Sequence, residues 1–285
     1  MAGITPSALK EFVRAEYDAA APGWERDWAS HFGPPAERLV EQLNPAAGDR
    51  CLDLACGSGL VARAFAARVG PALVTAVDLS SLQVEHARRA LAGAGLAGVR
   101  LEVRDAERLG FAPASFERVG CGFGISHFPR PIVALRGVFR ILSPGGRAGF
   151  TVWGPWSRDL GFRLDSLLVR IVPALESLPV RPEDEALDRV VEQNSQPGRL
   201  DAMLRAAGFE RVRHRVHALV VHHPDAASFV DASLVGYEAD FDALELDADA
   251  RAGIRAQLMT TLAENAHHAI VSRRRFDTLV ARKPA

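Results

Sequence analysis

Strands and helices alternate regularly through the middle of this chain, and this rhythm constrains the fold more than any other feature. Apolar segments short enough for strands cover residues 50–55, 72–77, 99–103, 118–122 and 147–153. Apolar residues at helical spacing predict helices between them, over residues 60–69, 82–94 and 132–142. Strands that alternate with helices of this length indicate parallel βαβ units joined into a doubly wound sheet.

Helical sequence surrounds this core on both sides. Residues 1–45 read as an amphipathic arm, in which Pro34 and Pro35 are predicted to break the helix. Further helices are predicted over 154–196 and about 225–272. A helix at 200–207 and strands at 210–221 and 275–282 are predicted to belong to the sheet domain. We therefore expect an arm (1–45), a ligand-binding core (46–153), a cap insertion (154–196) and a C-terminal part (197–285). The three helical pieces are expected to form a cap over the carboxyl edge of the sheet, where such folds bind ligands.

Charge and cysteine content exclude several classes of protein. The 285 residues carry 34 basic and 35 acidic side chains, and this balance argues against a nucleic-acid partner. Three cysteines cannot build a disulfide framework, and no apolar run approaches the length of a membrane span. The N-terminus has no apolar signal core. We expect a cytoplasmic monomer or homodimer that acts on a small molecule.

The segment CLDLACGSGLVARA, Cys51 to Ala64, is the most informative motif. A strand runs into Gly57-Ser58-Gly59 and then into a helix, so the glycines allow a tight turn and a close approach of backbone to ligand. Asp53 lies within the end of the strand, and Asp78 ends the next strand, 21 residues after Gly57. An acid at the position of Asp78 accepts hydrogen bonds from ribose hydroxyls in dinucleotide-binding folds.

Asp53 decides between the ligands that such a loop could hold. A carboxylate beside a pyrophosphate is unfavourable because like charges repel, so a nicotinamide-dependent dehydrogenase is disfavoured. A ligand with cationic groups suits this loop better.

These residues resemble the class I S-adenosylmethionine-dependent methyltransferases. The resemblance rests on the loop motif, on Val-Asp-Leu-Ser at 77–80, and on Arg-Asp-Ala-Glu at 104–107. The stretch Phe123 to Arg147 is similar to the ubiquinone/menaquinone-type group of that family. The close resemblance covers residues 49–153. It implies a doubly wound, seven-stranded Rossmann-like methyltransferase sheet with an antiparallel last strand, to which the chain adds helical cap insertions.

The resemblance also implies which residues bind S-adenosylmethionine. Asp53 would order the loop near the amino group of the cofactor, Asp78 would hold the ribose hydroxyls, and Asp105 would contact the adenine amino group. The remaining positions implied are Tyr17 and Trp24 in the arm, Ala55, Gly57, Ser58 and Gly59 in the loop, and Leu79, Ala106, Glu107 and Cys121 after or within later strands. The family commonly has a glycine where Arg104 stands, so that arginine must point away from the adenine. Helix packing is an equal alternative for Tyr17 and Trp24.

Two histidines are candidate general bases for a methyl transfer. His127 follows the fourth strand, where the loop faces a bound substrate, and His31 lies in the arm. A packing role is the alternative for each. No arrangement of carboxylates and an asparagine suggests a metal site, and Cys51 and Cys56 lack a second ligand pair at zinc spacing, so no metal is predicted.

We therefore expect a methyltransferase of secondary metabolism that acts on a small apolar or amphipathic metabolite, with oxygen favoured over carbon and nitrogen as the acceptor. One alternative is an enzyme on the same scaffold that catalyses cyclisation, rearrangement or decarboxylation, with a structural cofactor. A nucleic-acid methyltransferase ranks last, because the segment after the fourth strand reads GFGISHF and lacks an NPPY-like motif.

Overall fold

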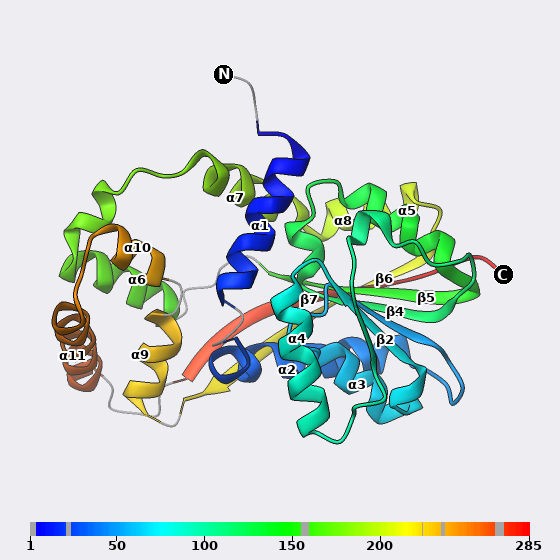
Figure 1. The fold of residues 1–285 in the computed structure, drawn as a ribbon, viewed down its shortest axis with the longest axis horizontal. Coiled ribbons are helices and arrows are strands. Elements are labelled where there is room, and N and C mark those ends of the chain that lie inside the picture. The colour runs from blue at the N-terminus through cyan, green and yellow to red at the C-terminus, as the bar shows by residue number, and fades with distance from the viewer. Residues whose placement is uncertain (1–3, 21–23, 155–159, 224, 235–236, 266–270) are drawn as a thin grey trace.

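Seven strands form one mixed sheet in the order β3-β2-β1-β4-β5-β7-β6 (Figure 1). The computed structural model describes residues 4–20, 24–154, 160–223, 225–234, 237–265 and 271–285. The strands are β1 Cys51–Leu54, β2 Val74–Asp78, β3 Arg100–Val103, β4 Phe116–Gly122, β5 Leu142–Trp153, β6 Glu210–His222 and β7 Val271–Arg282. The first five are parallel, and β7 pairs antiparallel with both β5 and β6. The predicted seven-stranded doubly wound sheet is confirmed.

Helices cover both faces of the sheet, and the central strands β1 and β5 are largely buried between them. On one face lie α2 Trp24–Leu43, α3 Leu60–Val69 and α4 Ser81–Gly93, and on the other lie α5 Pro131–Ile141 and α8 Pro197–Ala206 (Figure 1). Separate apolar clusters fill the two sides of the sheet. The predicted bounds of α3 are confirmed, and those of the other core elements differ by a few residues. The largest difference is β5, which begins at Leu142 and includes the segment Ser143–Gly146 that was expected to precede it.

The prediction that Pro34 and Pro35 break the arm was wrong, since α2 continues through both residues. A proline inside a helix costs about 3 kcal/mol. The helical turns that follow bury Leu39, Val40 and Leu43 against the sheet, and this burial offsets the cost. The second half of α2 is therefore part of the core, and the first helix, α1 Pro6–Ala20, stands apart from it.

The remaining helices gather beyond the carboxyl ends of the parallel strands (Figure 1). Four of them share an apolar cluster of their own: α6 Leu160–Ile171, α9 Ala226–Leu234, α10 Glu238–Ala243 and α11 Ala248–Asn265. The fifth, α7 Pro182–Asn194, packs against α1 and the short 3-10 helix Gly124–His127. The proposed division into arm, core and insertions remains a prediction.

One glycine of this 3-10 helix has no room for a side chain. A Cβ on Gly124 would lie 2.5 Å from the Cβ of Ala55 and 3.3 Å from the Sγ of Cys121. We expect Gly124→Ala to lower the free energy of unfolding by about 1–3 kcal/mol in urea denaturation. Gly137→Ala, within α5, is the control. A Cβ on Gly137 would lie 3.7 Å from the nearest side-chain atom, Leu109 Cδ1, so we expect the free energy of unfolding to rise by about 0.5–1 kcal/mol. Equal stability of the two variants would contradict this packing.

Candidate functional site

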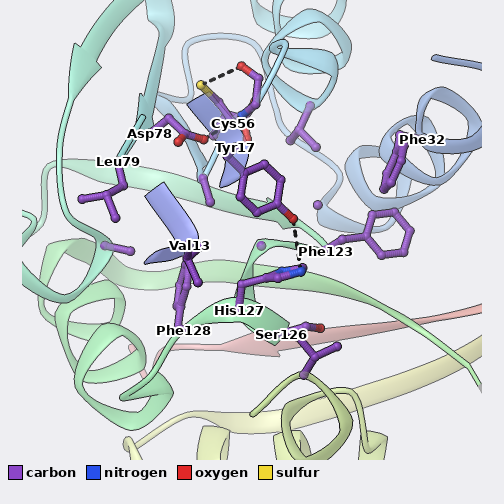
Figure 2. A pocket seen from close by; sticks show the side chains of 18 of the residues that line it. Val13, Tyr17, Phe32, Cys56, Asp78, Leu79, Phe123, Ser126, His127 and Phe128 are labelled. Carbon is purple, nitrogen blue, oxygen red and sulfur yellow. Dashed lines mark hydrogen bonds between the residues drawn. The ribbon is translucent and has the colours of Figure 1, made fainter. Parts of the chain in front are cut away.

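A cavity of about 430 Å³ lies at the carboxyl edge of the sheet, against α1 (Figure 2). The ends of β1, β2, β4 and β5 meet here because these strands are parallel. Most of the site residues predicted from the sequence line it: Tyr17, Asp53, Ala55, Gly57, Ser58, Asp78, Leu79, Asp105, Ala106, Glu107 and His127. Five separate chain segments thus contribute residues to the lining of one cavity.

The glycine loop bends sharply as it leaves β1. Ala55 takes a left-handed conformation with φ 56°, and Gly57 and Gly59 follow with φ 51° and 85°. The buried carboxylate of Asp53 holds the start of α3, since its Oδ2 accepts a 2.8 Å hydrogen bond from the Ala62 amide. Its Oδ1 is buried without a hydrogen-bond partner among the described residues. This oxygen is available to a donor in the cavity.

Asp78 connects the loop with the end of β2. Its two oxygens accept hydrogen bonds of 2.9 Å from the amides of Gly57 and Ser80. Burial raises the pKa of Asp78, and these amide hydrogen bonds act in the opposite direction. A carboxylate offers about four lone-pair sites, so Asp78 keeps capacity for hydroxyl donors.

A buried charge network closes the cavity beside β3. The Lys10 ammonium of α1 lies 2.7 Å from Asp105 Oδ2 and 2.8 Å from Glu107 Oε2. Arg130 also pairs with Glu107, at 2.8 Å. Because one cation of α1 contacts two carboxylates of the core, this network fixes the helix over the site. The Arg104 side chain bonds to Glu102 and to the Leu109 carbonyl.

Tyr17 and His127 meet in the middle of the cavity (Figure 2). The tyrosine hydroxyl and His127 Nε2 are 3.1 Å apart. Burial lowers the pKa of His127 to about 4. Burial also raises the pKa of Tyr17, and the charge of Asp78 adds to this. At neutral pH the pair is therefore an uncharged phenol beside an uncharged imidazole.

Aromatic rings form the end of the cavity away from Asp78. Phe123 and Trp153 stack with ring centroids 4.2 Å apart, and Phe32 packs edge-on against both. The Arg274 guanidinium lies 5.5 Å from the Trp153 ring centroid. Phe123 directly follows β4 in a left-handed conformation with φ 66°, which directs the chain into the 3-10 helix that carries His127.

The structure does not bring every predicted residue to the cavity wall. His31 is buried beside it, where burial, Arg274 and His223 lower its pKa to about 4. Cys121 lies fully buried behind Gly122, and Gly59 packs against Leu91 instead of lining the cavity. Trp24 begins α2, but its side chain lies outside the residues that the structure describes.

Sequence reasoning missed Lys10 and the aromatic rings. A signal for Lys10 existed, because Lys10, Val13 and Tyr17 have helical spacing and all three line the cavity. The chain also has only two lysines, so this one stood out among the arginines. No comparable signal marked Phe32, Phe123 and Trp153, which come together only through folding.

Asp53 gives the cofactor-free protein a pH-dependent stability. Burial raises its pKa from 3.8 to about 8, with the Ala62 hydrogen bond opposing and Asp78 adding. The folded state thus holds a proton that the unfolded chain has lost, so stability falls as the pH rises from about 4 to about 8. The lowered pKa values of His31 and His127 have the opposite effect, but only between about 4 and 6.5.

Between pH 6.5 and 8 we therefore expect the free energy of unfolding to decrease. Asp53 contributes up to about 1.4 kcal/mol per pH unit to this slope. Urea denaturation of Asp53→Asn should show a clearly smaller slope, since the amide does not titrate. An identical slope in the variant would contradict this assignment.

The cavity fits a cationic nucleoside cofactor. The side chains of Asp53, Asp78 and Asp105 line it, and Oδ1 of Asp53 has no hydrogen-bond partner among the described residues. This lining suits ammonium, sulfonium and hydroxyl groups better than phosphates. Fold and cavity together define a Rossmann-like enzyme that binds such a cofactor.

Comparison with known proteins gives the family. Residues 51–146 match the family model described as a methyltransferase domain. The aklanonic acid methyltransferase of Streptomyces sp. (strain C5) is 32% identical over 73% of this chain and 96% of its own length. The nocamycin O-methyltransferase of Saccharothrix syringae is 29% identical over 88% of this chain and 90% of its own. A ubiquinone/menaquinone biosynthesis C-methyltransferase of Bordetella avium (strain 197N) is 29% identical, over 71% and 78%.

Solved structures share the fold. A phosphoethanolamine N-methyltransferase 2 of Haemonchus contortus, in complex with S-adenosyl-L-methionine, aligns with a TM-score of 0.60 at 18% identity, over 99% of this chain and 61% of that one. The (4+2)-cyclase SpnF aligns with a TM-score of 0.54 at 20% identity, over 89% and 81%.

This chain belongs to the class I S-adenosylmethionine-dependent methyltransferases. It is an enzyme of the small-molecule type, and S-adenosylmethionine is its cofactor. No helix in the described part of the chain is both long and apolar enough to cross a membrane.

Proposed function

We propose that this enzyme methylates an oxygen atom of a small apolar or amphipathic metabolite. The Tyr17–His127 pair carries this proposal, because it places an uncharged imidazole inside a mostly apolar cavity. A hydroxyl acceptor must lose its proton as the new bond forms, and histidine is the commonest base for that task. His31, buried beside the cavity, is the second candidate for the base.

The cofactor residues are assigned from the wall of the cavity. The bound cofactor supplies an electrophilic methyl group on a cationic sulfur. Asp53 Oδ1 accepts from the amino group, Asp78 accepts from the ribose hydroxyls, and Asp105 accepts from the adenine amino group. Leu79 and Ala106 pack against the adenine, and Tyr17 covers the cofactor from α1. These assignments rest on the cavity lining and the free acceptor capacity described above.

The aromatic end of the cavity supports an acceptor with a flat apolar part. Phe32, Phe123 and Trp153 would contact such a molecule, and ring–ring contacts of this kind contribute about 0.5–1.5 kcal/mol each beyond area burial. The relatives named for aklanonic acid and nocamycin support a metabolite of secondary metabolism. The relative named as a C-methyltransferase keeps carbon as the second candidate for the acceptor atom.

The alternative is a cyclisation, rearrangement or decarboxylation in which the cofactor stays intact. The likeness to a cyclase concerns the fold alone. The experiment is therefore designed to detect a reaction that leaves the cofactor intact. The cytoplasmic location, the oligomeric state and the absence of a metal or a nucleic-acid partner remain predictions.

We expect transfer of a ¹³C-labelled methyl group from the cofactor to oxygen. Purified enzyme would be incubated with labelled S-adenosylmethionine and a panel of polycyclic phenols. The panel includes analogues with an unsubstituted ring carbon beside the hydroxyl, so that both oxygen and carbon acceptors are offered. Carbon NMR of the product distinguishes O-methyl from C-methyl signals directly. A C-methyl product would overturn the oxygen assignment while leaving methyl transfer in place.

A further inference from the structure

A second concave surface lies on the α2 face of the sheet, beside the edge strand β6. It is a cavity of about 790 Å³ bounded by α2, β6 and β7. Six arginines and one acid, Glu41, line it. We call it the arginine groove, after Arg38, Arg147, Arg211, Arg213, Arg215 and Arg282.

Most of the positive charge in the arginine groove is not neutralised. Among the described residues, Arg38 pairs with Glu41 at 2.8 Å, and Arg211 lies 3.9 Å from Glu210. Arg147 and Arg282 donate to backbone carbonyls instead. No ion pair of Arg213 or Arg215 is found in the described part of the chain.

The directions of the pKa shifts of Arg147 and His217 agree with this excess of positive charge. Burial lowers the pKa of Arg147, and the charges of Arg118, Arg282 and Arg213 lower it further. Burial also lowers the pKa of His217, together with Arg38 and Arg215, while Asp277 opposes them. The groove therefore has a positive potential that an anionic partner would relieve.

The groove extends from the α2 face of β6 to its outer edge. Six consecutive residues, Arg215 to Val220, line it, whereas one face of a strand would present only alternate residues. Among the described strands β6 pairs with β7 alone, so its outer backbone groups are open to another strand. Val216 and Val220 on this edge are 55% and 47% exposed.

The spacing of the arginines matches an extended chain. Arg213 and Arg215 lie two residues apart on one face, about 6.8 Å from each other. Acidic side chains at alternate positions of an added strand would have the same repeat, and opposite charges across a strand pair stabilise it. Pairing of β6 with a second copy of itself would bring its arginines together, which is unfavourable.

Charged residues on an edge strand also deter aggregation. That role would account for Arg213 and Arg215, which belong to the edge strand β6. It does not account for Arg147 and Arg282, which belong to the interior strands β5 and β7 and converge on the same groove.

We propose that the arginine groove is a docking site for an acidic, extended segment of a partner protein, which pairs with β6 as an additional strand. The proposal is independent of the methyl-transfer chemistry, because none of these arginines lines the cofactor cavity.

Fluorescence anisotropy with a labelled ten-residue peptide of alternating glutamate and valine tests this proposal. We expect saturable binding that weakens with added salt. The double variant Arg213→Glu/Arg215→Glu should bind at least about tenfold more weakly, because like charges then face each other. Arg63→Glu/Arg68→Glu on the exposed side of α3 is the matched control and should bind like wild type.

Two further probes separate strand pairing from charge attraction. A peptide with the same glutamates but proline in place of valine lacks the backbone N–H groups of the substituted positions. It should bind about tenfold more weakly, because strand pairing needs these donors. Equal binding of the two peptides would overturn the strand-pairing proposal. Tighter binding of a single-stranded oligothymidylate of equal charge would overturn the protein partner in favour of a nucleic acid. S-adenosylhomocysteine affinity, measured in parallel, should be unchanged in both double variants.

Discussion

Replacing Asp78 by alanine is expected to weaken binding of S-adenosylmethionine and S-adenosylhomocysteine by about a hundredfold or more. The carboxylate holds the Gly57 amide and is assigned two ribose hydroxyls. Each hydrogen bond to a charged group contributes about 1.5–3 kcal/mol, so the loss of two of them is large. Isothermal titration calorimetry on the wild type and the variant measures the effect.

Asp201→Ala is the matched control, because Asp201 lies on α8 and pairs with Arg205 on the surface. Its cofactor affinity should equal that of the wild type. Thermal unfolding of Asp78→Ala separates lost binding from lost folding. A folded Asp78→Ala protein with unchanged affinity would remove Asp78 from the cofactor site.

Replacing His127 by alanine is expected to reduce kcat by about 10²–10⁴-fold, the range that general-base catalysis contributes. Cofactor affinity should change far less, because the assigned polar contacts of the cofactor lie on other residues. In the wild type, kcat/KM should rise with pH around pH 4, where His127 of the free enzyme loses its proton, and stay flat through neutrality. Tyr17→Phe, which removes the hydroxyl 3.1 Å from Nε2, should shift this limb.

His222→Ala provides the control, since this histidine is exposed at the end of β6. Steady-state kinetics with the acceptor identified by the labelling experiment would compare the wild type with the three variants. An unchanged kcat in His127→Ala would assign the base elsewhere, with His31 as the next candidate to replace.

The core of the fold was predictable because its signals are local. Short apolar strands, amphipathic helices and glycine turns between residues 46 and 153 each agree with the final sheet. The path of α2 through Pro34 and Pro35 was not predictable from the prolines themselves. It depends on burial of Leu39, Val40 and Leu43 against strands that lie more than a hundred residues further along the chain.

The cavity was predictable for a topological reason. Asp53, Asp78 and Asp105 each lie at or just beyond the carboxyl end of a parallel strand, and those ends meet at one edge of the sheet. The Lys10 contact with Asp105 and Glu107 depends on how α1 docks, and so does the Tyr17–His127 contact. No local pattern specifies that docking, so the sequence predicted Tyr17 and His127 at the site without their contact, and it did not predict Lys10.

The most direct test of the central account follows the fate of the cofactor during turnover. Mass spectrometry would quantify S-adenosylmethionine, S-adenosylhomocysteine and product while the enzyme acts on an acceptor from the panel. We expect one S-adenosylhomocysteine to form for each product molecule, and each product molecule to carry the labelled methyl group. Conversion of an acceptor while S-adenosylmethionine stays intact and the product unlabelled would contradict this expectation.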